Sequence, residues 1–336
     1  MSINRQIRLK SRPVGSPTAA NFDLVDAPMP PVGDGVLRRT IYLSLDPYMR
    51  GRMSDARSYA APVAVGDVMV GHTVSQVVES KNPDFRAGDF VAGYDGWQQY
   101  AVSSGKELRT LDPGAVPIST ALSVLGMPGL TAYVGLIDIG KPKAGETVVV
   151  SAASGAVGSV VGQLAKVRGC RAVGVAGSDE KCRYVTNELG FDACVNYKSG
   201  ALSAALAAAC PNGIDIDFEN VGGAVMSAVL RQLNRGARVP LCGLIAGYNE
   251  TTDGGGPNLR PLLVSRATIQ AFIISDHFDR FPAALQEMTP LVRAGRLKYR
   301  EDVTEGLDQA PAAFIGLLEG RNFGKALVRV SPDPTR

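Results

Sequence analysis

The chain has 336 residues, of which 20% are charged and 45% hydrophobic, and its 35 basic and 32 acidic residues give a formal charge of +3. This length predicts two domains, and the small charge disfavours nucleic acid as the main partner. No apolar run reaches the roughly 18 residues of a membrane span, so a membrane is not an expected partner either. The five cysteines are scattered and odd in number, which predicts free thiols in a reducing cytoplasm.

Residues 1–126 predict a β domain. Segments 36–45, 68–79 and 89–93 are rich in β-branched residues, and turn clusters separate them. The last segment, 298–336, ends in an alternating strand at 325–330, and we expect it to return and complete this first domain.

Residues 127–297 alternate between strand-like and helix-like segments, the pattern of a Rossmann-type doubly wound parallel sheet. The predicted strands are 146–151, 171–176, 193–197, 214–218, 238–243 and 268–274, and a glycine-rich loop is expected at 251–257. The fold class is therefore α/β with a separate β domain.

The turn after the first of these strands is the main chemical signal. Gly155 and Gly158, with Ala156 and Val157 between them, lead into a helix whose N-terminus can bind a pyrophosphate. Ala153 stands where G-x-G-x-x-G has its first glycine. The alternative is a tight turn without a ligand, but the strand–turn–helix context favours dinucleotide binding.

The end of the second strand points to NADPH. An NAD site usually has an acidic residue there, whereas this strand ends in Gly177 and Ser178, and Lys181 follows one helical turn later. Asp179 and Glu180 can serve the dipole of that helix.

Several strings resemble one family. They are YLSLDPYMR (42–50), SAASGAVG (151–158), AGSDEKCRY (176–184), FENVGG (218–223), CGLIAGYN (242–249) and NFGK (322–325). Together they resemble the leukotriene hydroxydehydrogenase/prostaglandin reductase group of zinc-independent medium-chain reductases, which includes plant double-bond reductases and bacterial curcumin-reducing enzymes. The resemblance implies a GroES-like β-barrel domain beside the NADP-binding domain, a homodimer, and NADPH-dependent reduction of the C=C bond of enones and enals.

The same resemblance implies a set of cofactor contacts. Lys181 and Tyr197 would meet the 2′-phosphoribose, and Val264 stands where some members have a tyrosine that is proposed to assist protonation. The full predicted set is Gly155, Ala156, Val157, Gly158, Ser178, Lys181, Tyr197, Asn220, Cys242, Gly243, Leu244, Ile245, Tyr248, Phe272, Ile273, Ile274 and Asn322.

No metal site is expected. No cysteine precedes Cys170, and the chain has only two histidines, His72 and His277, which are predicted to be structural. Without a Lewis acid, an enone is an easier substrate than a simple carbonyl, because hydride addition to its β-carbon yields a delocalised enolate. Tyr48 and Tyr248 are the candidate proton donors.

Some interpretations stay open at this point. Trp97, with Tyr94 and Tyr100, could line a substrate entrance or fill the β domain, whereas Arg50 and Arg52 are expected to be solvated or paired with local acids. The alternative functions are an NADPH:quinone oxidoreductase and a low-turnover NADPH-binding or RNA-associated protein.

Overall fold

The computed structural model describes residues 3–251 and 256–336, so residues 252–255 of the predicted loop lie outside the described residues. The chain divides into two compact units. The first joins residues 1–123 to residues 301–336, and the second comprises residues 124–300. Among the described residues, no helix is long and apolar enough to cross a membrane.

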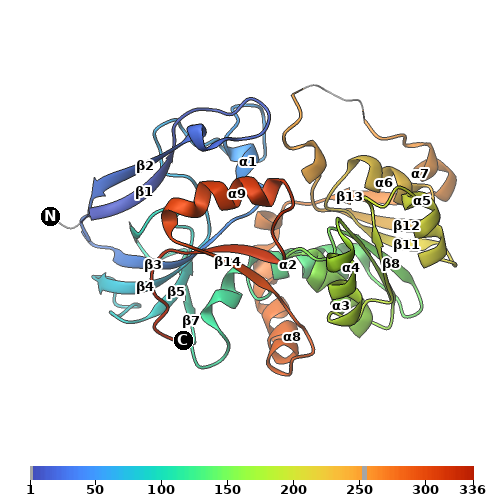
Figure 1. Cartoon of the computed structure of the whole chain (residues 1–336). Helices are drawn as coiled ribbons and strands as arrows, with labels where there is room; N and C mark the ends of the chain where they lie inside the picture. Colours follow the sequence, from blue (N-terminus) through green and yellow to red (C-terminus); the bar gives the residue numbers. More distant parts are fainter. Residues whose placement is uncertain (1–2, 252–255) are drawn as a thin grey trace. The chain divides into compact units, whose positions relative to one another are not determined.

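The first unit is built on a seven-stranded sheet that combines strands from residues 36–111 with strands from the C-terminal segment (Figure 1). Its order is β14 (Glu301–Glu305), β15 (Lys325–Arg329), β3 (Val36–Ser44), β4 (Thr73–Ser80), β5 (Phe90–Gly93) and β7 (Arg109–Leu111), and β6 (Tyr100–Ser103) also pairs with β3. β15 runs antiparallel to β3, so residues 301–336 complete this sheet. A separate ribbon holds β1 (Ile3–Leu9) and β2 (Phe22–Pro28), and two helices, α1 (Met49–Arg52) and α9 (Ala310–Leu318), complete the unit.

Trp97 lies in the core of this unit. Its indole is fully buried, stacks on Phe22 at 5.6 Å between ring centroids, and meets Phe314 edge-on at the same distance. Such contacts join β2 to α9 through one large apolar side chain. Trp97 therefore fills the β domain, which decides for this residue, though not for the exposed Tyr94, the question that the sequence left open.

The second unit is a six-stranded parallel sheet. Its order is β10 (Ala193–Asn196), β9 (Arg171–Ala176), β8 (Thr147–Ser151), β11 (Ile214–Phe218), β12 (Leu233–Leu241) and β13 (Thr268–Ala271). Its helices are α2 (Met127–Tyr133), α3 (Gly158–Val167), α4 (Asp179–Asn187), α5 (Leu202–Ala209), α6 (Gly223–Leu230), α7 (Arg260–Ser265) and α8 (Phe281–Arg293). This is the Rossmann order, and it confirms the predicted doubly wound sheet beside a separate β domain. The order reverses between β8 and β11, where such sheets bind their ligands.

Two predicted strands are shorter than expected. The strand predicted at 68–79 begins only at Thr73, because the residues before it pair with β1: the Met69 N–H donates to the Ile7 carbonyl at 3.0 Å. The strand predicted at 268–274 ends at Ala271, and a 3₁₀ segment (Ile274–Arg280) follows.

Asp217 is an acid in the apolar interior of the second unit. It pairs in register with Val149 of β8, which packs with Val225 and Val229 of α6. The side chain is fully buried, and neither carboxyl oxygen has a hydrogen-bond partner among the described residues. Burial, with the nearby Glu219 carboxylate, raises the pKa of Asp217 well above its usual value. The folded protein therefore holds this carboxyl in its protonated form.

Asp217→Asn removes this titration and is expected to flatten the dependence of stability on pH. An unfolded aspartate releases its proton near pH 4 while the folded one retains it, so the free energy of unfolding falls above about pH 4, by at most about 1.4 kcal/mol per pH unit. Thermal midpoints of the wild-type chain should drop more between about pH 5 and about pH 8 than those of the variant. Replacement of the exposed Asp84 by asparagine is the control. Parallel pH profiles for wild type and Asp217→Asn would contradict the protonated state.

Candidate functional site

The side chain of Glu219 ties together the carboxyl ends of β8 and β11. Its Oε1 accepts hydrogen bonds from Ser151 Oγ (2.7 Å) and from the N–H groups of Val221 (2.6 Å) and Gly222 (3.0 Å). Asn220 donates to Ser151 twice, from its N–H to Oγ (2.7 Å) and from Nδ2 to the carbonyl (2.8 Å). Burial raises the pKa of Glu219, and the donors around it oppose that shift. This network fixes the backbone at the point where strand order reverses.

The backbone of Glu219 extends the network to β12. Its carbonyl accepts from the N–H groups of Cys242 (2.9 Å) and Gly243 (3.2 Å). The Tyr248 side chain lies beside Gly243. A Cβ added to Gly243 would be 3.1 Å from the Tyr248 hydroxyl oxygen, and this oxygen accepts a hydrogen bond from the Leu244 N–H. Burial raises the pKa of the Tyr248 phenol and brings that of the Cys242 thiol to about 12, so both groups keep their protons at neutral pH.

The segments after β11 and β12 also pack on each other. The Ile245 N–H donates to the Asn220 carbonyl at 3.2 Å, and the Leu244 side chain would lie 2.9 Å from a Cβ on Gly222. The structure thus brings together Asn220 and the predicted segment from Cys242 to Tyr248.

The turn after β8 has a backbone that suits phosphate binding. Ala152 takes a positive φ of 52°, and its carbonyl accepts from the Gly155 N–H at 2.9 Å. A Cβ on Gly158 would lie 2.5 Å from the Ala152 carbonyl oxygen, so glycine is required where α3 begins. Residues 155–157 are partly exposed at the N-terminus of α3, where N–H groups can meet an anion.

Gly174 explains why Ala153 can replace the first glycine of the motif. A Cβ on Gly174 of β9 would lie 2.7 Å from the Cβ of Ala153, which is fully buried. The turn after β8 can therefore still approach β9 closely. The glycine that makes this possible is Gly174 on β9 instead of a glycine at position 153 in the turn.

Two side chains lie beside the end of β9, next to Gly177. A Cβ on Gly177 would be 3.2 Å from Cε1 of Tyr197 and 3.6 Å from Cε of Lys198. The Lys198 ammonium stands over the Tyr197 ring at 5.7 Å from its centroid. Lys181 lies in the first turn of α4, where its N–H donates to the capping Ser178 hydroxyl at 3.2 Å. Sequence reasoning missed Lys198, although its position directly after Tyr197 was a usable signal.

Asp179 does not contribute a carboxylate to the end of β9 in the way that an NAD site requires. It is the first residue of α4, and its Oδ1 accepts a hydrogen bond from Asn196 Nδ2 at 2.7 Å. It therefore joins α4 to β10 and lies in the turn where the helix dipole favours an acid.

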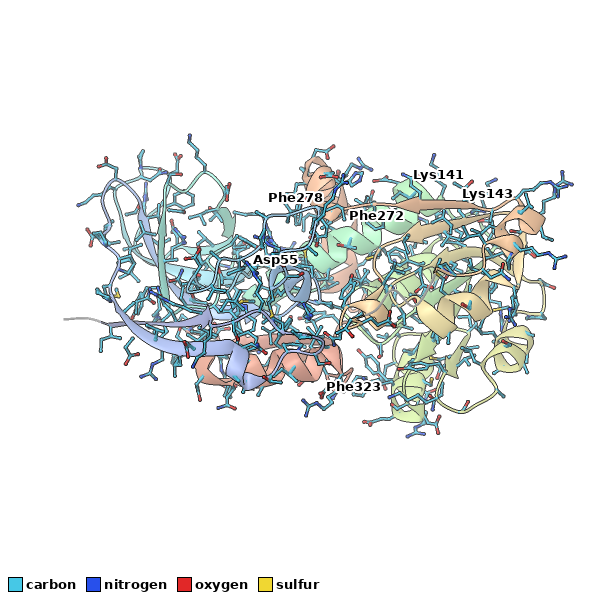
Figure 2. The ribbon with its side chains drawn as sticks, turned by 90° about the horizontal axis from the view of Figure 1, so that it is seen from above. Asp55, Lys141, Lys143, Phe272, Phe278 and Phe323 are labelled. Atoms are coloured by element: carbon cyan, nitrogen blue, oxygen red, sulfur yellow. The ribbon has the colours of Figure 1, made fainter. Side chains whose placement is uncertain are left out.

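Phe272 has its side chain in the interior of the second unit. It directly follows β13, at the carboxyl end of the parallel strands. Lys143 precedes β8 and so lies at the amino end of the strands; Figure 2 labels both residues. Its ring meets the Phe218 ring edge-on, with 6.4 Å between the ring centroids. A Cβ added to Gly135 would lie 2.8 Å from the Phe272 ring. This leaves the backbone and the half-buried Ile273 and Ile274 as the groups that could contact a ligand there.

Tyr48 belongs to a polar cluster in the first unit. Its hydroxyl lies 3.3 Å from that of Tyr94, which Arg52 Nη1 approaches to 3.5 Å. The His72 ring meets Tyr94 edge-on at 4.7 Å. Burial, with the Asp46 carboxylate, raises the pKa of Tyr48 well above its usual value, and burial lowers that of His72. Two tyrosine hydroxyls beside a guanidinium can donate hydrogen bonds to an oxygen atom.

A buried ion pair holds the segment that carries Tyr48. Lys325 Nζ donates to Asp46 Oδ1 and to the Leu45 carbonyl, both at 2.6 Å, and the Ser44 hydroxyl donates to the other Asp46 oxygen. The two family-like strings YLSLDPYMR and NFGK therefore meet in space. Asn322, also in NFGK, donates from Nδ2 to the Gly324 carbonyl at 2.7 Å and shapes that turn.

Arg50 is not solvated, which was one of the two alternatives predicted for it. It is 7% exposed, and its Nη2 donates to the Gly15 carbonyl at 2.7 Å. It stabilises the loop at Gly15 because a buried guanidinium needs acceptors.

In the described parts of the chain, no three side chains of the His, Cys, Asp and Glu types gather as a metal ion would require. His72 and His277 belong to different units. His277 instead meets the Phe272 ring at 6.3 Å.

Comparisons with known proteins cover nearly the whole chain. A family model described as the N-terminal domain of oxidoreductase matches residues 5–111, and one described as zinc-binding dehydrogenase matches residues 156–290. The chain is 53% identical to the NADPH-dependent curcumin reductase of Escherichia coli (strain K12) and 42% identical to the NADP⁺-dependent 2-alkenal reductase of Nicotiana tabacum, in each case over 98% of both chains. The crystal structure of CurA from Vibrio vulnificus in complex with NADPH matches with a TM-score of 0.93 and 51% identity, covering 98% of this chain and 100% of that one.

Relatives this similar, aligned from end to end, confirm the family that the sequence strings predicted. The chain belongs to the zinc-independent medium-chain dehydrogenase/reductase family, in the group that contains the curcumin and 2-alkenal reductases.

Proposed function

We propose that the chain reduces the carbon–carbon double bond of α,β-unsaturated ketones and aldehydes with NADPH. The observation that carries the coenzyme choice is the end of β9, where Tyr197 and Lys198 lie beside Gly177 and Lys181 lies in the next helical turn. An NAD site has a carboxylate at this point for the ribose 2′-hydroxyl. Ammonium groups and a phenol suit a 2′-phosphate instead. The similarity to curcumin and alkenal reductases supports enones as the substrate class.

The remaining cofactor contacts follow from the carboxyl edge of the second unit. The N-terminus of α3, with Gly155 to Gly158, would hold the pyrophosphate. Asn220 and the segment from Cys242 to Tyr248 would line the nicotinamide side, since the Glu219 network holds both in place. Ser178 and the segment 272–274 are further proposed contacts in this unit, and the family resemblance adds Asn322, which belongs to the first unit.

When bound, NADPH supplies the hydride that adds to the β-carbon of the enone and leaves an enolate. The chain then has to hold the enolate oxygen and let a proton reach the α-carbon. Tyr248 keeps its phenol proton because burial raises its pKa, so it can donate a hydrogen bond or a proton at neutral pH. Tyr48, next to Tyr94, is the corresponding donor in the first unit.

We also propose a homodimer. β13 is an edge strand of the described six-stranded sheet, and three apolar side chains just before it are well exposed: Leu259 (57%), Leu263 (80%) and Val264 (69%). An open strand edge flanked by apolar side chains supports association with a second copy. Sedimentation equilibrium at the mass of one chain would contradict this proposal.

The proposed function is tested by the oxidation of NADPH with a panel of linear enals, cyclic enones and quinones. We expect turnover with the enals and enones and saturated products by mass spectrometry, with two hydrogens added to the C=C bond. Treatment with a strong chelator should leave the rate unchanged, because the residues before Cys170 offer no thiolate for zinc. Turnover of quinones alone would make the chain a quinone reductase, and a chelated enzyme restored by zinc would contradict the metal-free reaction.

Lys181→Ala and Lys198→Ala should each raise the KM for NADPH and leave that for NADH nearly unchanged. Each lysine is proposed to meet a phosphate that NADH lacks, and a charge-assisted hydrogen bond is worth about 1.5–3 kcal/mol, or roughly tenfold or more in affinity. The exposed Lys106→Ala is the control. An equal rise for both coenzymes would assign these lysines to the fold or to the pyrophosphate.

Tyr248→Phe is expected to lower kcat by about a hundredfold while changing the KM for NADPH much less, since a general acid contributes to the chemical step. Tyr48→Phe should mainly raise the KM for the enone. Tyr59→Phe, at a side chain that is 60% exposed, is the matched control. If neither variant changes kcat, water and the ribose hydroxyl must deliver the proton.

A further inference from the structure

Two cysteine thiols lie side by side at the edge of the second unit. Cys182 is in α4 and Cys194 is in β10, and their thiols hydrogen-bond to each other. Both are partly exposed and line an open depression of about 320 Å³, which is completed by Asp179, Arg183, Thr186 and Asn196. Solvent and small molecules therefore reach a pair of sulfur atoms that are already in contact.

The packing around the pair explains why the sulfurs approach each other. A Cβ on Gly174 of β9 would lie 3.1 Å from Cys194 Sγ, so the glycine leaves the space that this sulfur uses. Asn196 Nδ2 donates to Asp179 Oδ1 at 2.7 Å and holds the first turn of α4 against β10. These contacts fix the helix and the strand that carry the two thiols.

The two thiols have different acidities. The hydrogen bond from Cys194 and the Ala176 N–H lower the pKa of Cys182, against burial and the Asp179 carboxylate. The same hydrogen bond and burial raise the pKa of Cys194 well above its usual value. Cys182 also lies in the first turn of α4, where the helix dipole favours an anion, so we assign it as the thiol that forms the thiolate, the nucleophile in thiol oxidation.

We propose that Cys182 and Cys194 form a reversible disulfide when the chain meets a hydroperoxide, and that the disulfide weakens NADPH binding. The Cys182 thiolate attacks one oxygen of the O–O bond, which forms a sulfenic acid and releases the alcohol after protonation. Cys194 then attacks the Cys182 sulfur, the S–S bond forms, and water leaves with the Cys194 proton. The two sulfurs lose two electrons in total, and the peroxide bond gains them.

The effect on coenzyme binding follows from the neighbours of the two cysteines and rests on the proposed function. Lys181 directly precedes Cys182, and Tyr197 and Lys198 follow Cys194 after two residues. An S–S bond of about 2.05 Å is much shorter than a hydrogen bond between thiols, so its formation draws the first turn of α4 toward β10. That movement changes the position of Lys181 relative to Tyr197 and Lys198, where the 2′-phosphate is proposed to bind.

The covalent step is tested on the full-length, fully reduced chain treated with tert-butyl hydroperoxide. Trypsin releases Cys182 in the dipeptide 182–183 and Cys194 in the peptide 184–198, so a disulfide joins two peptides that dithiothreitol separates again. We expect this linked pair by mass spectrometry. It should be absent from Cys182→Ser and Cys194→Ser and present in the control Cys210→Ser, which changes a buried thiol elsewhere in the unit. Absence of the linked pair from the wild-type chain would overturn the proposal.

The binding step is measured as the Kd for NADPH by fluorescence before and after oxidation. We expect an increase of about tenfold, equivalent to one charge-assisted hydrogen bond, with reversal by dithiothreitol and no increase in either cysteine variant. A disulfide without a change in Kd, or an equal increase in Cys182→Ser, would overturn the proposed regulation. The peptide readout needs no turnover, so a reduced chain that fails to reduce enones would contradict the proposed function and leave the disulfide result standing.

Discussion

The candidate site depends on one buried carboxylate, that of Glu219. Its Oε1 collects three hydrogen bonds from the ends of β8 and β11, and its carbonyl holds the beginning of the segment after β12. A buried charge is costly unless donors compensate it, so the contacts to Oε1 favour the arrangement of the β8 and β11 ends that supplies these donors, while the backbone carbonyl holds the end of β12. The backbone at the switch point is thus shaped by side-chain chemistry as well as by strand order.

The first unit has a comparable constraint in the buried pair of Asp46 and Lys325. Lys325 Nζ lies 2.6 Å from both Asp46 Oδ1 and the Leu45 carbonyl. Such a pair adds little net stability, but removal of one partner leaves an unpaired buried charge. The pair joins β15, near the C-terminus, to the segment that carries Tyr48. A site contribution from residues 45–48 therefore requires the last strand of the chain.

Much of this could be predicted because it is encoded locally. The six parallel strands, the turn at Gly155 and Gly158, and the missing carboxylate after β9 each follow from a few consecutive residues. β1 was missed because its inward positions include Asn4 and Gln6, which do not look like core residues. Both are buried all the same, since Asn4 bonds to Gln98 and to the Tyr100 carbonyl, and Gln6 bonds to Gln98.

The sequence by itself determined the class of fold, the glycine turn that is proposed to bind phosphate, and the family, because periodicity, glycine spacing and long family-like strings are properties of neighbouring residues. The tertiary structure decided which distant side chains meet. It placed Trp97 in the core, Gly174 against Ala153, Lys198 beside Gly177, and Cys182 against Cys194. These contacts depend on which strands are neighbours and on how closely their side chains pack, and no local pattern records either.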